Sequence, residues 1–133
     1  MLNKISKAVD KGAAAESLAL HYLQNQGLTL VEKNFNLKQG EIDLIMMDSG
    51  TLVFVEVRFR RNSKYGTPAE TVNTAKQKKL LLAAAIYLQQ KGLTDRYPCR
   101  FDVVAITQAE RKIKSQPNQK PEFNWHKDAF SAF

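Results

Sequence analysis

Two stretches of the chain repeat apolar residues at the spacing of an α-helix. From about residue 10 to 26 they recur at i, i+3, i+4, i+7 and i+8, which predicts a helix with one buried stripe. The same spacing predicts a second helix over residues 74–91. Thr74 and Gln77 fit a capping box that would start this second helix, and Gly92 predicts its end.

Four other stretches are rich in β-branched and aromatic residues and predict strands. Three of them follow one another closely, at residues 28–35, 42–47 and 51–59. A turn signal at residues 48–50 predicts that the last two form a hairpin. The fourth strand, over residues 100–107, is apolar almost throughout, which favours burial on both of its faces.

The order strand, helix, strand between residues 51 and 107 predicts a βαβ unit, whose two strands are parallel and whose crossover is right-handed. The expected fold is therefore α/β: a single domain over residues 1–133, with a central mixed sheet flanked by helices. That sheet joins an antiparallel hairpin to a parallel pair. Residues 108–121 predict a mobile basic loop, and residues 123–133 an apolar segment that docks back onto the core.

The predicted hairpin turn decides which charged side chains face each other. Counting back from a two-residue turn pairs Asp43 with Glu56 and Glu41 with Arg58, all on one face of the sheet. Two opposed carboxylates repel each other unless a cation or a proton intervenes, and Mg²⁺ or Mn²⁺ prefers such oxygen ligands. The alternative is a salt-bridge cluster, in which Arg58 neutralises the acids without a metal. A three-residue loop would instead slip the register by one residue.

The net charge of the chain indicates what kind of partner it binds. A net charge of +7 and a pI of about 9.6 favour a polyanion, either nucleic acid or an anionic membrane surface. Basic residues gather between residues 58 and 79, where Glu70 is the only acid. The candidate phosphate contacts are Arg60, Arg61, Lys64, Lys76, Lys78 and Lys79. Acids that hold a metal beside a basic rim are what a metal-dependent phosphodiesterase needs, although the lysines of the helix could equally form a solvated face.

The sequence predicts the cellular compartment through its single cysteine and through the signal peptide and membrane span that it lacks. Cys99 is the only cysteine, so the chain forms no internal disulfide and no cysteine-based zinc site. No signal-peptide pattern opens the sequence, and the longest apolar stretch, residues 80–88, is about half the length of a membrane span. We therefore expect a soluble cytoplasmic protein without a membrane partner.

Several motifs together resemble a known family. They are Gly40-Glu41-Ile42-Asp43-Leu44-Ile45, Leu52-Val53-Phe54-Val55-Glu56-Val57-Arg58, Tyr65-Gly66-Thr67-Pro68 and Lys76-Gln77. In this order and spacing, over about residues 10–107, they resemble the bacterial YraN-like family. That family is largely uncharacterised and is placed in the PD-(D/E)XK superfamily, with restriction endonucleases and Holliday-junction resolvases. The resemblance implies a metal-dependent endonuclease on branched or structured DNA, and it implies a homodimer.

The resemblance also implies roles for individual residues. Asp43 and Glu56 would be metal ligands, with the backbone carbonyl of Val57 as a third and Glu16 of the first helix nearby. Gln77 would be a polar helix residue near the site, a position that its capping box explains equally well. From the residues alone, Glu16 lies beside the buried stripe of its helix and could equally face solvent.

The departure from the superfamily pattern is Arg58, which stands where the superfamily has lysine. Arginine stays charged and cannot act as a general base, but it can orient water or stabilise charge in the transition state. Proton removal would then fall to water activated by the metal or to a second group such as Glu41. The alternatives are a non-catalytic nucleic-acid-binding relative and an interaction protein whose basic face meets an acidic partner.

Overall fold

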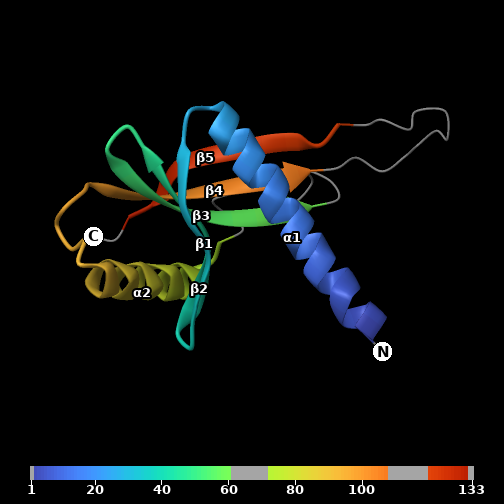
Figure 1. The fold of residues 1–133 in the computed structure, drawn as a ribbon, viewed down its shortest axis with the longest axis horizontal. Coiled ribbons are helices and arrows are strands. Elements are labelled where there is room, and N and C mark those ends of the chain that lie inside the picture. Colours follow the sequence, from blue (N-terminus) through green and yellow to red (C-terminus); the bar gives the residue numbers. More distant parts are fainter. Residues whose placement is uncertain (1, 61–71, 108–119, 132–133) are drawn as a thin grey trace.

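Over the residues that the structure describes, the chain forms two helices and one sheet (Figure 1). The computed structural model describes residues 2–60, 72–107 and 120–131, with side chains from residue 12 onward. The helices are α1 (Leu2–Asn25) and α2 (Thr74–Lys91), and the strands are β1 (Thr29–Leu37), β2 (Gly40–Asp48), β3 (Thr51–Arg60), β4 (Cys99–Thr107) and β5 (Glu122–Phe130). Neither helix combines the length and the apolar character that crossing a membrane requires.

The strands lie in the order β1-β2-β3-β4-β5, so each strand neighbours the next one in the chain. β3 and β4 are parallel, with α2 between them in the sequence, and the other neighbouring pairs are antiparallel. This confirms the α/β class, the mixed sheet and the βαβ unit. The segment expected only to dock back onto the core forms a fifth strand at the sheet edge. Most of the expected basic loop, residues 108–119, lies outside the described residues.

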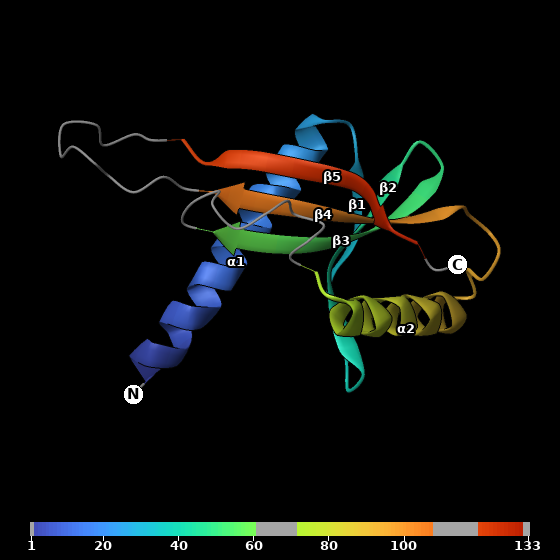
Figure 2. The ribbon, with the colours of Figure 1, turned by 180° about the vertical axis from the view of Figure 1, so that it is seen from behind.

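The two helices cover opposite faces of the sheet. Successive side chains of a strand point to opposite faces, and Val53 and Val55 pack in one apolar cluster with α1, whereas Phe54 packs in the other with α2. Figures 1 and 2 show α1 crossing the sheet, while α2 lies beside the hairpin of β1 and β2. That hairpin approaches α2 so closely at Gly40 that a Cβ there would lie 3.3 Å from the Cβ and carbonyl oxygen of Lys79. Glycine at this position therefore permits the contact.

Strand β2 departs from strict alternation at Asp43. Ile42 and Ile45 both belong to the apolar cluster under α2, whereas Leu44 belongs to the cluster under α1. On the neighbouring strand β1, the ladder skips the rung between Asn34 and Asp43, although the rungs on either side of it are formed. Asn34 has a φ of 56°, in the left-handed region that a regular strand does not use. The sheet is therefore locally irregular where the Gly-Glu-Ile-Asp motif ends, at Asp43.

The start of α2 differs from the predicted capping box. The N-cap is Asn73 rather than Thr74, because the Asn73 side-chain oxygen accepts the backbone N–H of Lys76 at 2.9 Å. Asparagine caps helices at least as well as threonine, so the residue one position earlier takes the role. The Gln77 side chain donates instead to the carbonyl oxygen of Val72 at 2.8 Å.

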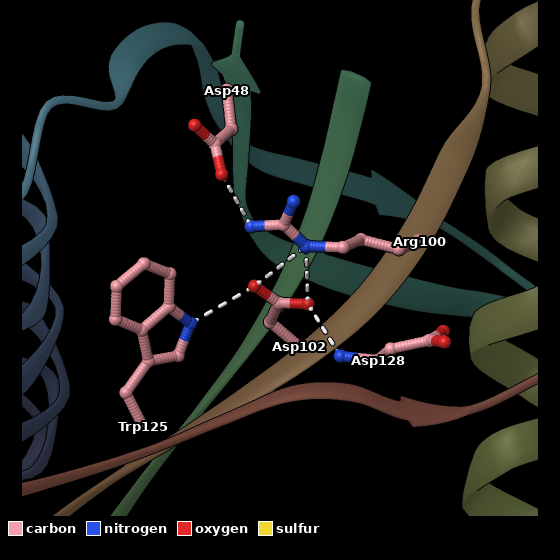
Figure 3. Close-up of polar contacts among 5 residues, drawn as sticks. All are labelled: Asp48, Arg100, Asp102, Trp125 and Asp128. Carbon is pink, nitrogen blue, oxygen red and sulfur yellow. Dashed lines mark hydrogen bonds and ion pairs between the residues drawn. The ribbon is translucent and has the colours of Figure 1, made fainter.

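The edge strand β5 is fixed to β4 by one buried carboxylate, that of Asp102 (Figure 3). Asp102 is 1% exposed and accepts hydrogen bonds from Arg100 Nε at 3.0 Å, Trp125 Nε1 at 2.9 Å and the Asp128 backbone N–H at 2.9 Å. The guanidinium of Arg100 also donates to Asp48 at 2.8 Å. A charge buried this deeply is tolerated because every side of it meets a donor.

We predict that Asp102→Asn lowers the free energy of unfolding by about 2 kcal/mol or more, because an amide NH₂ would replace one acceptor among three donors. Urea unfolding followed by tryptophan fluorescence measures the change. The matched control is Asp48→Asn, which removes a partly exposed partner of the same arginine and should cost less than about 1 kcal/mol. Equal losses in the two variants would contradict the anchoring role of Asp102.

Candidate metal centre

The candidate site forms where β2 and β3 separate. Their ladder runs from the Asp48–Thr51 rung to the Leu44–Val55 rung, in the register that the sequence predicts. The next rungs expected from that register are absent, so the predicted ladder pairs Asp43–Glu56 and Glu41–Arg58 are wrong. The physical reason is a competing acceptor.

The Asp43 carboxylate takes the place of a backbone partner. Its Oδ2 accepts the backbone N–H of Val57 at 2.8 Å, so the amide of β3 bonds to a side chain instead of to the main chain of β2. The hydrogen bond also ties the carboxylate to the rim of the gap between the strands. Polar groups of both strands become available there without leaving this buried amide unsatisfied.

A pocket of about 390 Å³ occupies this gap. It receives side chains from both strands and from both helices, because the gap opens toward both faces of the sheet. The lining residues are Gly12, Ala15 and Glu16 of α1, Glu41 and Asp43 of β2, Glu56, Val57, Arg58 and Phe59 of β3, and Lys76 of α2. All four predicted metal-ligand positions, together with Glu41 and Arg58, therefore meet in one pocket, although the strands are not paired there.

Glu56 carries an unpartnered atom in this pocket. Its side chain is 7% exposed, and its Oε1 lies 3.5 Å from Arg58 Nε and 3.8 Å from Lys76 Nζ. Its Oε2 is buried and has no hydrogen-bond partner. Burial raises the pKa of Glu56, and the nearby Lys76 and Arg58 oppose that rise. A buried carboxylate oxygen without a donor is unusual in a folded protein and marks a place where a cation would be stabilised.

The same surroundings disfavour the charged form of the Asp43 carboxyl group. Burial and the neighbouring Glu56 raise its pKa to about 7, against the lowering effect of the Val57 hydrogen bond. Partial burial raises the pKa of Glu16 as well, while hydrogen bonding to the side chains of Asn34 and Asp43 lowers it. Glu16 thus lies on the site side of α1, which answers the question that the sequence left open. The acids stand close enough to disfavour one another's charge.

The donor set fits a hard divalent ion. Asp43 and Glu56 offer buried carboxylate oxygens, which suit Mg²⁺ or Mn²⁺. Within residues 2–60, 72–107 and 120–131 no three acidic, histidine or cysteine side chains are already gathered for a metal. A closed structural site of zinc type would need four such ligands. Mg²⁺ needs only one or two carboxylates and fills its other positions with water and phosphate oxygens, so an open pair of acids is sufficient.

The ion pairs of Glu56 bear on the metal-free alternative. Arg58 pairs with Glu56, its neighbour on the same strand, rather than with Asp43 or Glu41 as a salt-bridge cluster would require. Lys76, expected among the nucleic-acid contacts, reaches the same carboxylate from α2. Both cations approach Oε1 and leave Oε2 without a hydrogen bond. The two basic side chains therefore neutralise the site only in part.

None of the other predicted basic residues that the structure describes lines this pocket. Lys78 and Lys79 are exposed on α2, and Arg60 ends β3 just after the pocket. Arg61 and Lys64 lie outside the described residues. Gln77, expected near the site, is not among the residues that line the pocket, because its amide is turned to the carbonyl of the preceding loop.

A larger cavity, of about 460 Å³, lies between α2, the start of β4 and the end of β5. Its walls include Phe54, Phe101 and Phe130, whose rings stack in a row. Its two acidic residues are Asp95, from a loop, and Asp128, from the edge strand β5. Both are exposed, so neither is a buried carboxylate. Size alone would point here, but the buried carboxylates Asp43 and Glu56 line the smaller pocket.

We predict that, in metal-free protein, Asp43→Asn removes a fall in stability that the wild type shows between about pH 4 and pH 7. The raised pKa of Asp43 means that the folded state holds a proton which the unfolded chain has lost. Its contribution is complete below the unfolded pKa and disappears as the pH rises through about 7. Thermal unfolding in chelator across this range measures the effect.

Asparagine keeps an oxygen for the Val57 N–H, so the variant should be more stable than the wild type at pH 8. The control is Asp95→Asn, a change at an exposed loop position, which should leave the pH profile unaltered. The account would be contradicted if the stability of the wild type rose from pH 4 to pH 7 and the Asp43→Asn variant showed the same rise.

The chain resembles proteins that share one family description. The model of "Uncharacterised protein family UPF0102" matches residues 15–106. A UPF0102 protein of Stutzerimonas stutzeri is 44% identical over 96% of this chain and 100% of its own length, and one of Hahella chejuensis is 46% identical over 98% and 97%. A UPF0102 protein of Janthinobacterium is 54% identical over 74% of this chain and 79% of its own. These matches confirm the resemblance to the YraN-like family, and the chain belongs to the uncharacterised family UPF0102.

Proposed function

We propose that this protein is a divalent-metal-dependent nuclease that binds nucleic acid and hydrolyses phosphodiester bonds, with branched or structured DNA as its substrate class. The observation that carries the proposal is the buried Oε2 of Glu56, which lacks a hydrogen-bond donor beside the equally buried Asp43. Two buried carboxylates this close together cost folding free energy in the absence of a cation. Retaining them is explained if they hold an ion that a reaction needs.

In this proposal Asp43 and Glu56 hold Mg²⁺ or Mn²⁺, and Glu16 and the backbone of Val57 lie beside them in the same pocket. When bound, the ion would supply a Lewis acid that polarises a phosphate oxygen and activates water. The resemblance to the PD-(D/E)XK superfamily supports the same assignment, because an Asp and a Glu at these positions are its metal ligands. The function of a fold is nonetheless decided by the site and not by the scaffold.

The basic residues of the pocket would bind the scissile phosphate. Arg58 and Lys76 both face Glu56, so a phosphate bound in this pocket would meet two cations at once. The exposed Glu41 lies at the same pocket, where a carboxylate can accept a proton from water. Lys78 and Lys79 extend the positive surface along α2 toward neighbouring phosphates.

A second candidate is a non-catalytic nucleic-acid-binding protein that keeps this fold. It is favoured by Arg58, because arginine cannot exchange a proton and stands at the position where the superfamily has lysine. Both candidates retain the basic surface, so only turnover separates them. An interaction protein with an acidic partner would differ from both, because it would not bind nucleic acid. The homodimer implied by the resemblance is a separate proposal, which light scattering tests.

We predict that purified protein with Mn²⁺ or Mg²⁺ cuts at least one member of a panel of single-stranded, duplex and branched DNA. Asp43→Asn and Glu56→Gln should each reduce cleavage by at least about 100-fold, because either change removes a charged ligand of the ion. Denaturing gels of end-labelled substrates measure the cleavage. Asp95→Asn, which removes an acid far from the pocket, is the matched control and should cut like the wild type.

Cleavage that persists unchanged in both pocket variants would contradict the catalytic proposal and indicate a contaminating nuclease. Absence of cutting on every substrate, combined with DNA binding, would favour the second candidate. In that case the affinity should fall steeply with salt, since each neutralised phosphate releases counterions. A salt slope near zero would exclude a phosphate-dominated interface and leave the interaction protein.

A further inference from the structure

Asn34 is a residue whose conformation the proposed reaction does not explain. It lies within β1 but has a φ of 56°, and the ladder rung that it would share with Asp43 is missing. The left-handed region disfavours residues with a Cβ, and asparagine is among the few that tolerate it as single residues. Such outliers gather at functional sites, where the surrounding structure holds them in place.

The Asn34 side chain is directed toward α1. Together with Glu16 and Leu44 it lines a small cavity of about 100 Å³ between α1 and the strands. The Asn34 amide lowers the pKa of the Glu16 carboxyl across this cavity, as a nearby hydrogen-bond donor does. The same Glu16 lines the carboxylate pocket on its other side, where it also interacts with Asp43. Glu16 therefore lies between the cavity that Asn34 lines and the pocket that Asp43 lines.

Without a hydrogen-bond donor, the position of the Glu16 side chain over the pocket would be disfavoured. It is a half-buried side chain with several rotatable bonds, and Glu41 and Asp43 carry charges of the same sign nearby. Two groups of the neighbouring strand favour the Glu16 carboxylate there, the Asn34 amide and the charge of Lys33. The amide offsets the repulsion at the cost of one strained backbone residue.

We propose that Asn34 is a positioning residue that holds the Glu16 carboxylate over the metal pocket and thereby strengthens the binding of a divalent cation. The inference rests on the proposed metal function and deepens it, because it names the part of the chain that orders a third acid. Groups that orient the ligands of a metal typically change its affinity about 10- to 100-fold when removed.

Asn34→Gly tests the proposal, because glycine adopts a positive φ at no steric cost and removes only the amide. We expect Mn²⁺, titrated by calorimetry into chelator-treated protein, to bind at least about 10-fold more weakly than to the wild type. The melting temperature of the metal-free variant should stay close to that of the wild type, which separates positioning from folding. The matched control is Ser49→Gly, at a left-handed position in the β2–β3 turn, whose φ is 47°. It should leave Mn²⁺ affinity unchanged.

A double-mutant cycle shows whether Asn34 acts through Glu16. If it does, Asn34→Gly should add no further loss of affinity in a Glu16→Gln background. An additional loss there as large as in the wild type would overturn the proposal, and so would wild-type affinity in Asn34→Gly alone. Wild-type protein that takes up no Mn²⁺ would contradict the proposed function itself and this inference with it. Wild-type protein that binds Mn²⁺ while Asn34→Gly binds it equally well would contradict only the inference.

Discussion

The hydrogen bond from the backbone N–H of Val57 to the Asp43 carboxylate is the constraint on which the candidate site depends. It takes an amide of β3 away from the main chain of β2, at the point where the ladder between those strands ends. Because the amide is still satisfied, the strands can separate inside a sheet without a large penalty. The gap that results admits Glu16 from one helix and Lys76 from the other, and no continuous sheet would allow both to reach the same pocket.

Two buried aspartates show how differently the fold treats a negative charge. Asp102 is surrounded by donors from Arg100, Trp125 and the Asp128 amide, and it joins the edge strand to the sheet. Asp43 has one backbone donor and a neighbouring carboxylate, and its pKa is raised to about 7. The first arrangement stabilises the protein, whereas the second costs stability and is expected where a bound ligand supplies the missing positive charge.

The sequence predicted most of the scaffold because local signals and tertiary packing agree there. The apolar periodicity predicted both helices, although α1 begins at Leu2 and not near residue 10. Gly92 ends α2 with a φ of 67° as expected, and the turn at residues 48–50 gave the β2–β3 register as far as Leu44. It missed β5, whose burial alternates weakly because it is an edge strand. It also placed the cap of α2 at Thr74, because Gln77 completes a capping box with Thr74, whereas the structure uses Asn73 without such a box.

The sequence predicted which residues form the candidate site, but it did not predict how they are arranged. Simple alternation placed Asp43 with Glu56, and both do line the pocket, yet they meet through strand separation and not through a ladder rung. No periodicity marks Asn34, because a left-handed residue within a strand depends on its tertiary partners. Its only sequence signal was an asparagine inside a β-rich segment, and asparagine is the residue best suited to that backbone conformation after glycine.

The most direct test is a crystal of the protein soaked in Mn²⁺ and measured at the manganese absorption edge. The account predicts one anomalous peak in the gap between β2 and β3, within bonding distance of carboxylate oxygens of Asp43 and Glu56, with Oε2 of Glu56 among the ligands. A pocket without a peak, in which the Arg58 guanidinium instead forms a close ion pair with both carboxylates, would contradict it. The acids would then be held by a counter-charge of the protein's own.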